Sequence, residues 1–209
     1  MNVNDKATKA AQVWYRSVLV GRLKELYFKH LQRRYRFPEW HITPINFRPY
    51  AIGIVEYLNK QPKKKVVEIG CGLGEIIGNL SGCAREGLDL DVRAIKAAER
   101  LYRNSRFRVG TFEDIAGEKI DYLITVNFIH GIPPAELKRN YQCLCEKNDI
   151  KNVVLDITDS PNYRYVHDVS YLFDDLGYTV KKRLKRYQVV NGGRWIYILE
   201  KAVGGNDKK

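Results

Sequence analysis

The sequence predicts an α/β fold in which seven strands form a doubly wound, mostly parallel sheet. Short apolar stretches suited to buried strands alternate with stretches at helical spacing from residue 66 onward. A glycine-rich turn follows the first strand, at the place where open α/β sheets bind ligands. Two β-rich runs joined by "NGG", residues 191–193, close the chain and predict an antiparallel hairpin at one edge.

A helical region is expected before the sheet. Apolar residues recur at three- and four-residue spacings from about Lys6 to Tyr35, beginning with Trp14, and Lys and Arg lie between them. Pro38 and Pro44 end this pattern. A second helix is predicted at Pro49–Asn59, because proline is tolerated in the first turn of a helix.

These patterns divide the chain into an N-terminal helical extension at residues 1–60, a sheet domain at 61–203 and a disordered tail at 204–209. The strands are expected at Val66–Ile69, Gly87–Leu90, Phe107–Val109, Asp121–Asn127, Val153–Ile157, Thr179–Val190 and Trp195–Lys201. The helices between them are expected at Glu75–Leu80, Val92–Tyr102, Pro134–Cys145 and Tyr165–Leu176. Gly177 would end the last of these helices as a C-cap.

The composition bounds the class of protein. A chain of 209 residues is ample for one α/β domain with a real core, and a hydrophobic share of 44% argues against global disorder. No apolar run is long enough to span a bilayer, and the first ten residues lack the apolar stretch of a signal peptide. The four cysteines form no CxxC pair, so we expect reduced thiols in a cytoplasmic protein and no metal site.

The net charge of +12 is unevenly distributed. Residues 1–65 hold 14 basic and 4 acidic residues, whereas residues 66–150 hold 11 and 13. A second basic patch, "KKRLKR", spans Lys181 to Arg186. Such regions attract nucleic acid, acidic lipid or a phosphorylated small molecule, or they form an ordinary solvated surface, and the sequence leaves these alternatives open.

The turn in "VVEIGCGLGEII" places glycines at positions 70, 72 and 74, where a backbone without Cβ atoms allows a ligand to approach closely. Glu68 lies just before the first glycine, and Asp89 ends the second strand, where a carboxylate can accept two ribose hydroxyls. The glycines do not fit the GxGxxG pattern, because Glu75 or Ile77 would occupy its third glycine position. This argues against a dinucleotide.

At these residues the chain resembles the class I S-adenosylmethionine-dependent methyltransferases, over about Pro49 to Lys201. "VVEIGCGLGEII" is similar to the family's first motif, "GLDLDVRAIKAAE" to its second and "RVGTFEDI" to its third. "IDYLITVNFIHGIPP" resembles the motif at strand four, and "DDLGYTV" resembles the turn before the final hairpin. The resemblance implies a Rossmann-like fold, S-adenosyl-L-methionine as cofactor and methyl transfer as the activity.

The resemblance also implies which residues contact the cofactor. The glycine turn would pass under the methionine part, and Glu68 would lie near its ammonium group. Asp89 would bind the ribose hydroxyls. Arg48 would pair with the carboxylate through a bidentate fork, or it is a surface arginine. The full set of expected cofactor contacts is Arg48, Glu68, Gly70, Cys71, Gly72, Gly74, Asp89, Leu90, Thr111, Phe112, Glu113 and Asn127.

The adenine contacts depart from the family in one place. Leu90 would lie against the ring, and Phe112 would stack on it. Thr111 stands where the family often has an aspartate bound to the adenine amine, so Glu113 or Asp114 is expected to compensate.

His130 is the candidate catalytic base, because it follows the fourth strand and a hydroxyl nucleophile needs a proton acceptor. The alternative is a histidine that shapes the pocket. Asn127 is expected to line the same pocket, whereas His41 and Tyr50 lie where a lid over the substrate is expected, so these two and His130 are the candidate substrate contacts. His30 and His167 are expected on helix surfaces, and Asp156 and Asp159 are further candidates for substrate contact.

Three functions remain open at this point. The first is methyl transfer to a small molecule, most plausibly to a hydroxyl of a sugar or another biosynthetic intermediate, with a phosphorylated or nucleotide-linked acceptor suiting the basic N-terminal lid. The second is methylation of RNA or protein, in which the basic extension grips a polymer. The third is a non-catalytic scaffold that binds the cofactor. The sequence gives no oligomeric state.

Overall fold

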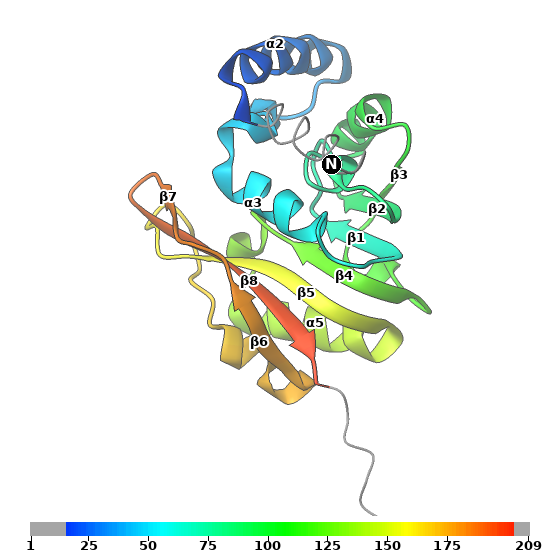
Figure 1. The fold of residues 1–209 in the computed structure, drawn as a ribbon, viewed down its shortest axis with the longest axis vertical. Helices are drawn as coiled ribbons and strands as arrows, with labels where there is room; N and C mark the ends of the chain where they lie inside the picture. Colours follow the sequence, from blue (N-terminus) through cyan, green and yellow to red (C-terminus); the bar gives the residue numbers. More distant parts are fainter. Residues whose placement is uncertain (1–15, 203–209) are drawn as a thin grey trace, which may run out of the picture. The chain divides into compact units, whose positions relative to one another are not determined.

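The computed structural model describes residues 16–202, whose helices and strands are drawn in Figure 1. These residues form two units. The first unit joins residues 16–62 to 71–109, and the second joins 63–70 to 110–202. The expectations for residues 6–15, including Trp14, and for the tail at 204–209 lie outside the described residues.

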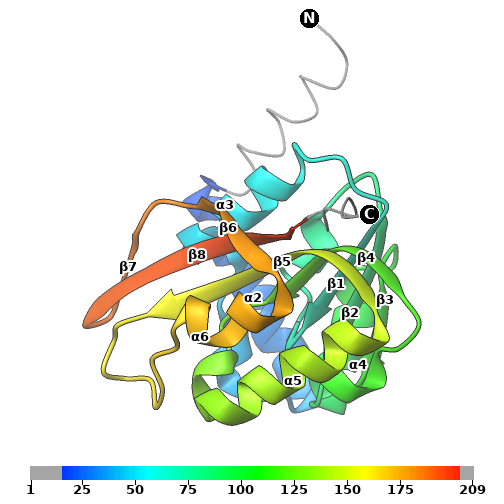
Figure 2. The same ribbon diagram turned by 90° about the horizontal axis from the view of Figure 1, so that it is seen from below.

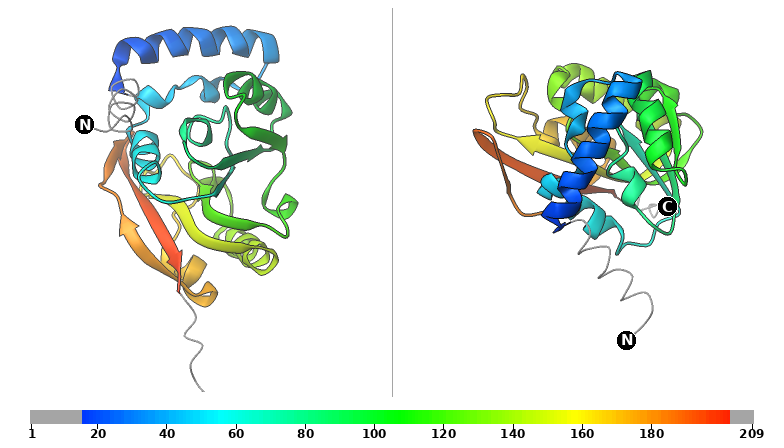
Figure 3. Two further views of the ribbon diagram at one scale, coloured as in Figure 1. Left: turned by 45° about the vertical axis from the view of Figure 1, so that its right-hand side comes forward. Right: turned by 90° about the horizontal axis from the view of Figure 1, so that it is seen from above.

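The first unit begins with helices. They are α2 (Val18–Tyr35), the 3₁₀ helices η1 (Glu39–Ile42) and η2 (Ile45–Phe47), and α3 (Pro49–Leu58). The side chain of Ser17 caps α2 by accepting a hydrogen bond from the Val20 N–H, and Arg36 in the left-handed conformation ends it. Figure 3 shows α2 as one uninterrupted helix.

The rest of the first unit is a βαβ arrangement in which β2 (Ala84–Asp89) pairs in parallel with β3 (Arg106–Val109), and α4 (Val92–Leu101) connects them. The Asp91 side chain caps α4 by accepting from the Arg93 N–H. Helices α2 and α4 share one core cluster, which consists of Phe28, Leu31, Phe37, Leu73, Ala94 and Ala97. This cluster fixes the N-terminal helix against the βαβ arrangement.

The second unit contains the larger part of the sheet. Strands β1 (Lys65–Ile69), β4 (Lys119–Thr125) and β5 (Asp149–Thr158) are parallel and lie in that order. They are buried nearly throughout, as expected for parallel strands. Strand β8 (Gly192–Lys201) pairs antiparallel with β5, and β6 (Tyr178–Arg183) and β7 (Tyr187–Val189) pair antiparallel with β8.

The helices of the second unit are α5 (Pro134–Lys147), α6 (Val169–Phe173) and the 3₁₀ turns η4 (Phe112–Asp114), η5 (Ile129–Gly131) and η6 (Asp174–Leu176). Figure 2 shows α5 and α6 side by side. The Tyr141 and Phe173 rings join these two helices at a centroid distance of 4.5 Å.

The predicted fold class is confirmed. The run predicted as one strand at Thr179–Val190 forms two strands, β6 and β7, so the described residues hold eight strands and not the predicted seven. Two helix predictions were wrong. Residues 75–80 form only the 3₁₀ turn η3 (Ile77–Asn79), because Gly78 disfavours a helix there and the Asn79 side-chain amide donates to the Glu75 carbonyl at 2.7 Å. The helix predicted at 165–176 begins only at Val169, where Asp168 caps it.

Candidate functional site

The glycine turn adopts a backbone that other residues rarely take. Gly70, Gly72 and Gly74 have φ angles of 70°, 53° and 73°, in the left-handed region that favours glycine. The Cys71 N–H donates to the Leu88 carbonyl at 2.9 Å, and the Cys71 side chain is buried. The turn after β1 is therefore tied to β2.

Asp89 holds this turn through its carboxylate. The Gly72 N–H donates to Asp89 Oδ2 at 2.8 Å, and the Asp91 N–H donates to Asp89 Oδ1 at 2.9 Å. A carboxylate has about four acceptor positions, so about two remain for a ligand. Leu90, the next residue, is 73% exposed.

His41 lies against the glycine turn from the N-terminal segment. A Cβ atom at Gly72 would lie 2.7 Å from His41 Nδ1, so only glycine fits beneath this ring. Burial lowers the pKa of His41, which Asp89 and Asp91 raise to a lesser extent. His41, which was predicted in a lid over the substrate, therefore lies next to the glycine turn. Tyr50, the second residue predicted in this lid, is buried in α3.

Glu75 is a residue that sequence reasoning missed. It is buried and accepts hydrogen bonds from the Ile45 N–H and the Tyr102 hydroxyl. Lys24 lies 3.4 Å and Arg48 lies 3.8 Å from its carboxylate. This carboxylate therefore ties the N-terminal helices to the chain segment that carries the glycines. Arg48, predicted to bind a ligand carboxylate, already faces a protein carboxylate.

Apart from Leu90 in the first unit, the predicted adenine contacts lie in the second unit around η4. Thr111 and Asp114 form a capping box, in which the Thr111 N–H donates to Asp114 Oδ2 at 2.8 Å. Phe112 is buried between the rings of Phe128 and Tyr141, at centroid distances of 5.9 and 5.6 Å. Asp114 is thus used by the turn itself. Glu113 is exposed and lines a cavity of about 320 Å³ together with Phe112, Asn140, Cys143 and Lys147.

The ends of β1 and β4 carry the other predicted contacts of this unit. Glu68 is buried in β1, in register with Ile124 of β4. A Cβ atom at Gly70 would lie 2.7 Å from Cγ of Phe128. Asn127 follows β4 with an exposed side chain and a φ angle of 72°, a conformation that is uncommon for residues other than glycine.

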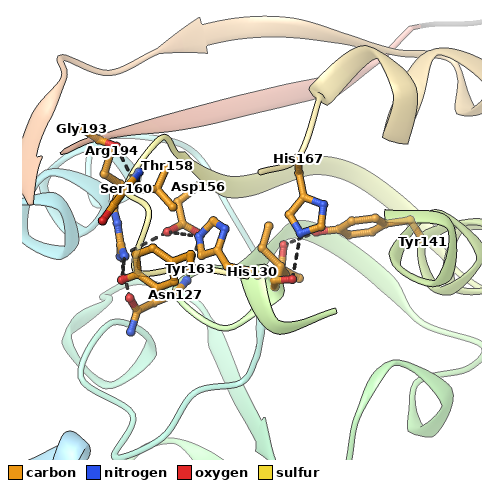
Figure 4. A network of polar contacts seen from close by, with 12 residues as sticks. Asn127, His130, Tyr141, Asp156, Thr158, Ser160, Tyr163, His167, Gly193 and Arg194 are labelled. Carbon is orange, nitrogen blue, oxygen red and sulfur yellow. Dashed lines mark hydrogen bonds and ion pairs between the residues drawn. The ribbon is translucent and has the colours of Figure 1, made fainter. Parts of the chain in front are cut away.

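A buried polar network holds Asn127 in place (Figure 4). The Asn127 N–H donates to Asp156 Oδ1 at 2.9 Å, and Arg194 Nη1 donates to Asn127 Oδ1 at 2.7 Å. Arg194 Nη1 also lies 3.2 Å from Asp156 Oδ2, and its Nη2 donates to the Tyr163 hydroxyl at 2.5 Å. Since Asn127 Oδ1 faces Arg194, its NH₂ group is the part of the amide left to point elsewhere.

His130 belongs to the same network. Its side chain is 1% exposed, its Nε2 lies 3.1 Å from Asp156 Oδ2, and its ring lies 4.8 Å from that of Tyr163. Nδ1 of His130 has no hydrogen-bond partner within residues 16–202. The placement of His167 on a helix surface was wrong, because it is buried before α6, with Nε2 2.9 Å from the Ile129 carbonyl. His30 is exposed on α2, as expected.

The sequence matches no family model and no curated protein. Solved structures share its fold. Magnesium protoporphyrin IX methyltransferase from Synechocystis with bound SAH aligns at 16% identity over 88% of this chain and 99% of its own, with a TM-score of 0.65. A TehB-like SAM-dependent methyltransferase from Corynebacterium glutamicum aligns at 17% identity over 71% of this chain and 85% of its own, with a TM-score of 0.56.

The chain has the class I S-adenosylmethionine-dependent methyltransferase fold. The candidate residues from the sequence lie at three places in this fold. These are the glycine turn, Asp89 at the end of β2, and Asn127 and His130 after β4. None of the helices within residues 16–202 has the length and apolar character needed to cross a bilayer. The described residues also bring together no group of three or more His, Cys, Asp or Glu side chains suited to a metal ion.

Proposed function

We propose that this protein transfers a methyl group from S-adenosyl-L-methionine to a small-molecule acceptor, at a hydroxyl of a sugar or another biosynthetic intermediate. The observation that supports the cofactor part of the proposal is the pairing of the Gly72 N–H with the Asp89 carboxylate at 2.8 Å. It places a left-handed glycine turn beside a carboxylate with free acceptor positions, which suits a ligand that carries a ribose diol.

The residues of the first unit fit the cofactor. Asp89 would accept hydrogen bonds from the two ribose hydroxyls with the acceptor positions that Gly72 and Asp91 leave open. Leu90 would lie against the adenine, since its side chain is exposed directly after β2. Arg48 would bind the cofactor carboxylate only by sharing its charge with Glu75, which lies 3.8 Å away.

In the second unit, we assign Glu68 to the ammonium group of the cofactor and Phe112 and Glu113 to the adenine. Asp114 is a poorer candidate for the adenine amine, because it accepts the Thr111 N–H in the capping box. Glu113 has an exposed carboxylate and lines the cavity next to η4. We therefore assign the Glu113 carboxylate to the contact with the adenine amine that an aspartate at the position of Thr111 often makes in the family.

The bound cofactor would supply an activated methyl group on a sulfonium centre. The protein's part is then to orient the acceptor and to take up its proton. Asn127 would orient the acceptor through its NH₂ group, since Arg194 holds its Oδ1 at 2.7 Å. His130 would receive the proton at Nδ1, because its Nε2 faces Asp156, whose carboxylate would stabilise the imidazolium. Nδ1 is buried in the structure, so this role requires a movement that admits the acceptor to the ring.

We further propose that residues 1–60 form the lid over the substrate, 61–203 the catalytic domain and 204–209 a tail. Within the first unit, the position of the His41 ring over Gly72 supports a lid that reaches the glycine turn. The 14 basic residues among the first 65 would suit a phosphorylated acceptor.

Calorimetric titration tests the cofactor assignment. S-adenosylhomocysteine should bind with micromolar-scale affinity, and NAD should not bind. Asp89→Ala should weaken S-adenosylhomocysteine by about 1.5–3 kcal/mol, because it removes a charged acceptor from two hydroxyls. Glu99→Gln, a charge removal at an exposed position of α4, is the matched control and should leave affinity unchanged. Binding of NAD without S-adenosylhomocysteine would overturn the proposal.

A further inference from the structure

Helix α2 carries apolar side chains on a face that no described element of its unit covers. Leu19, Leu23 and Leu26 are 70%, 60% and 63% exposed, and they follow one another at spacings of four and three residues. Such spacings place side chains on one face of a helix. In the right-hand view of Figure 3, α2 lies in front of the other described elements of its unit. We call these three leucines the outer stripe.

The outer stripe is not needed for the packing of α2. The buried residues of this helix are Gly21, Phe28 and Leu31. Gly21 and Phe28 each lie two positions beyond a leucine of the stripe, or about 200° around the helix axis. They face the core cluster and η2, where a Cβ atom on Gly21 would lie 2.7 Å from the Phe47 ring. The helix therefore has one apolar face for its own fold and a second one turned outward.

Basic residues border the outer stripe. Arg22 and Lys29 each lie three positions beyond a leucine of the stripe, and Arg33 lies four beyond Lys29, so the three form one adjacent row. Glu25 pairs with Arg22 at 2.9 Å and with Lys29 at 2.7 Å, and it is the only acidic residue in the helix. Lys24 is turned to the buried Glu75, and the other four basic residues of α2 leave its exposed surface positive.

A partner that binds this face of α2 must offer apolar groups to the outer stripe and negative charge to the basic residues beside it. A second copy of α2 would bring two basic rows together, which disfavours self-association. RNA offers the charge, and Tyr27, 43% exposed beside the stripe, could stack on a base, but the three leucines themselves offer no stacking surface and favour an apolar phase. An anionic bilayer surface offers acyl chains to the leucines and negative headgroups to the arginines.

We propose that α2 docks in the plane of an anionic lipid bilayer, with the outer stripe in the acyl region and the basic row at the headgroups. A helix with leucines on one side and Lys or Arg beside them is suited to this interfacial position. The proposal concerns where the protein acts and does not depend on methyl transfer.

Vesicle flotation with the full chain tests the proposal. We expect binding to phosphatidylglycerol–phosphatidylcholine vesicles, little binding to phosphatidylcholine alone, and weakening at high salt, because exposed charges are screened. The variant L19Q/L23Q/L26Q should lose roughly tenfold or more of this binding while its helix persists, because glutamine is a good helix former. The matched control V166Q/V180Q/V190Q replaces three exposed valines of the second unit and should bind as before.

Circular dichroism checks that each variant is folded. If the leucine variant unfolds, R22Q/R33Q tests the same face by its charge and should weaken binding to the anionic vesicles alone. Equal binding by the leucine variant and the valine control would overturn the proposal. So would dimerisation that the leucine variant abolishes, or RNA binding at physiological salt that outcompetes the vesicles.

Discussion

Asp156 gives the sharpest test of the buried network. Its side chain is fully buried and faces Asn127 N–H, His130 Nε2 and Arg194 Nη1 at 2.9, 3.1 and 3.2 Å. Asp156→Ala removes the carboxylate that balances the charge of Arg194, which is itself buried. Breaking a buried ion pair from one side costs about 3–5 kcal/mol. For a chain of this length, that corresponds to a fall in Tm of roughly 6–20 °C.

Urea unfolding followed by circular dichroism measures this cost. Asp175→Ala is the matched control, because it removes an exposed carboxylate that pairs with Lys138 on the surface. Such a pair contributes about 0–1 kcal/mol. Asp156→Asn keeps the volume and removes only the charge, so it separates the electrostatic part from packing. If Asp156→Ala costs no more than Asp175→Ala, the network does not stabilise the fold as we describe.

The pH dependence of stability provides a second measurement on the same residue. Burial raises the pKa of Asp156, but the hydrogen bond and charge of His130, the charge of Arg194 and the Asn127 N–H outweigh it, so the pKa is lowered. A carboxyl with a lowered pKa in the folded state stabilises the fold above its unfolded pKa of about 3.9. This stability is lost as the pH falls through the lower folded value. Asp156→Asn should therefore lose less stability on acidification below about pH 4 than the wild type.

Two further predictions concern the end of β4. His130→Ala should reduce turnover by about 10²–10⁴-fold and leave the affinity for S-adenosylhomocysteine nearly unchanged, if His130 is the base for a hydroxyl. A loss of less than tenfold, measured by methyl transfer from labelled cofactor, would make it a pocket-shaping residue. Asn127→Gly should keep the folded stability within about 1 kcal/mol while raising KM for the acceptor, because glycine accepts the positive φ but lacks the amide. Asn127→Ala adds backbone strain, so it should be the less stable of the two.

The sequence predicted the sheet well because buried parallel strands appear as short apolar runs. It also assigned the glycine turn and Asp89 to one cofactor, but it did not predict that Gly72 donates to Asp89 directly. It failed at residues 75–80, where apolar spacing suggested a helix. The competing effects are local: glycine weakens the helix, and the Asn79 side chain takes the carbonyl of Glu75.

The roles of Glu75 and His167 could not be predicted from local pattern. Each is buried by segments distant in the chain, since Glu75 meets Lys24 and Ile45, and His167 meets Ile129. A signal for Glu75 was nevertheless present, because a carboxylate directly after a buried glycine turn requires donors. Several basic residues precede Glu75 in the sequence, and no local pattern indicates that Lys24 and Arg48 are the two that lie next to its carboxylate.

The network around Asp156 depends on strand register, which the sequence does not state. Antiparallel pairing of β5 with β8 sets Asp156 opposite Ile196 and Thr158 opposite Arg194, so two charged groups 38 residues apart meet near the end of β4. A one-residue slip would turn the Arg194 side chain to the other face of the sheet. Asn127 is then fixed twice, by its N–H to Asp156 and by its Oδ1 to Arg194. A positive φ at a residue other than glycine persists where its surroundings hold it, and here the two partners are side chains of the strands β5 and β8.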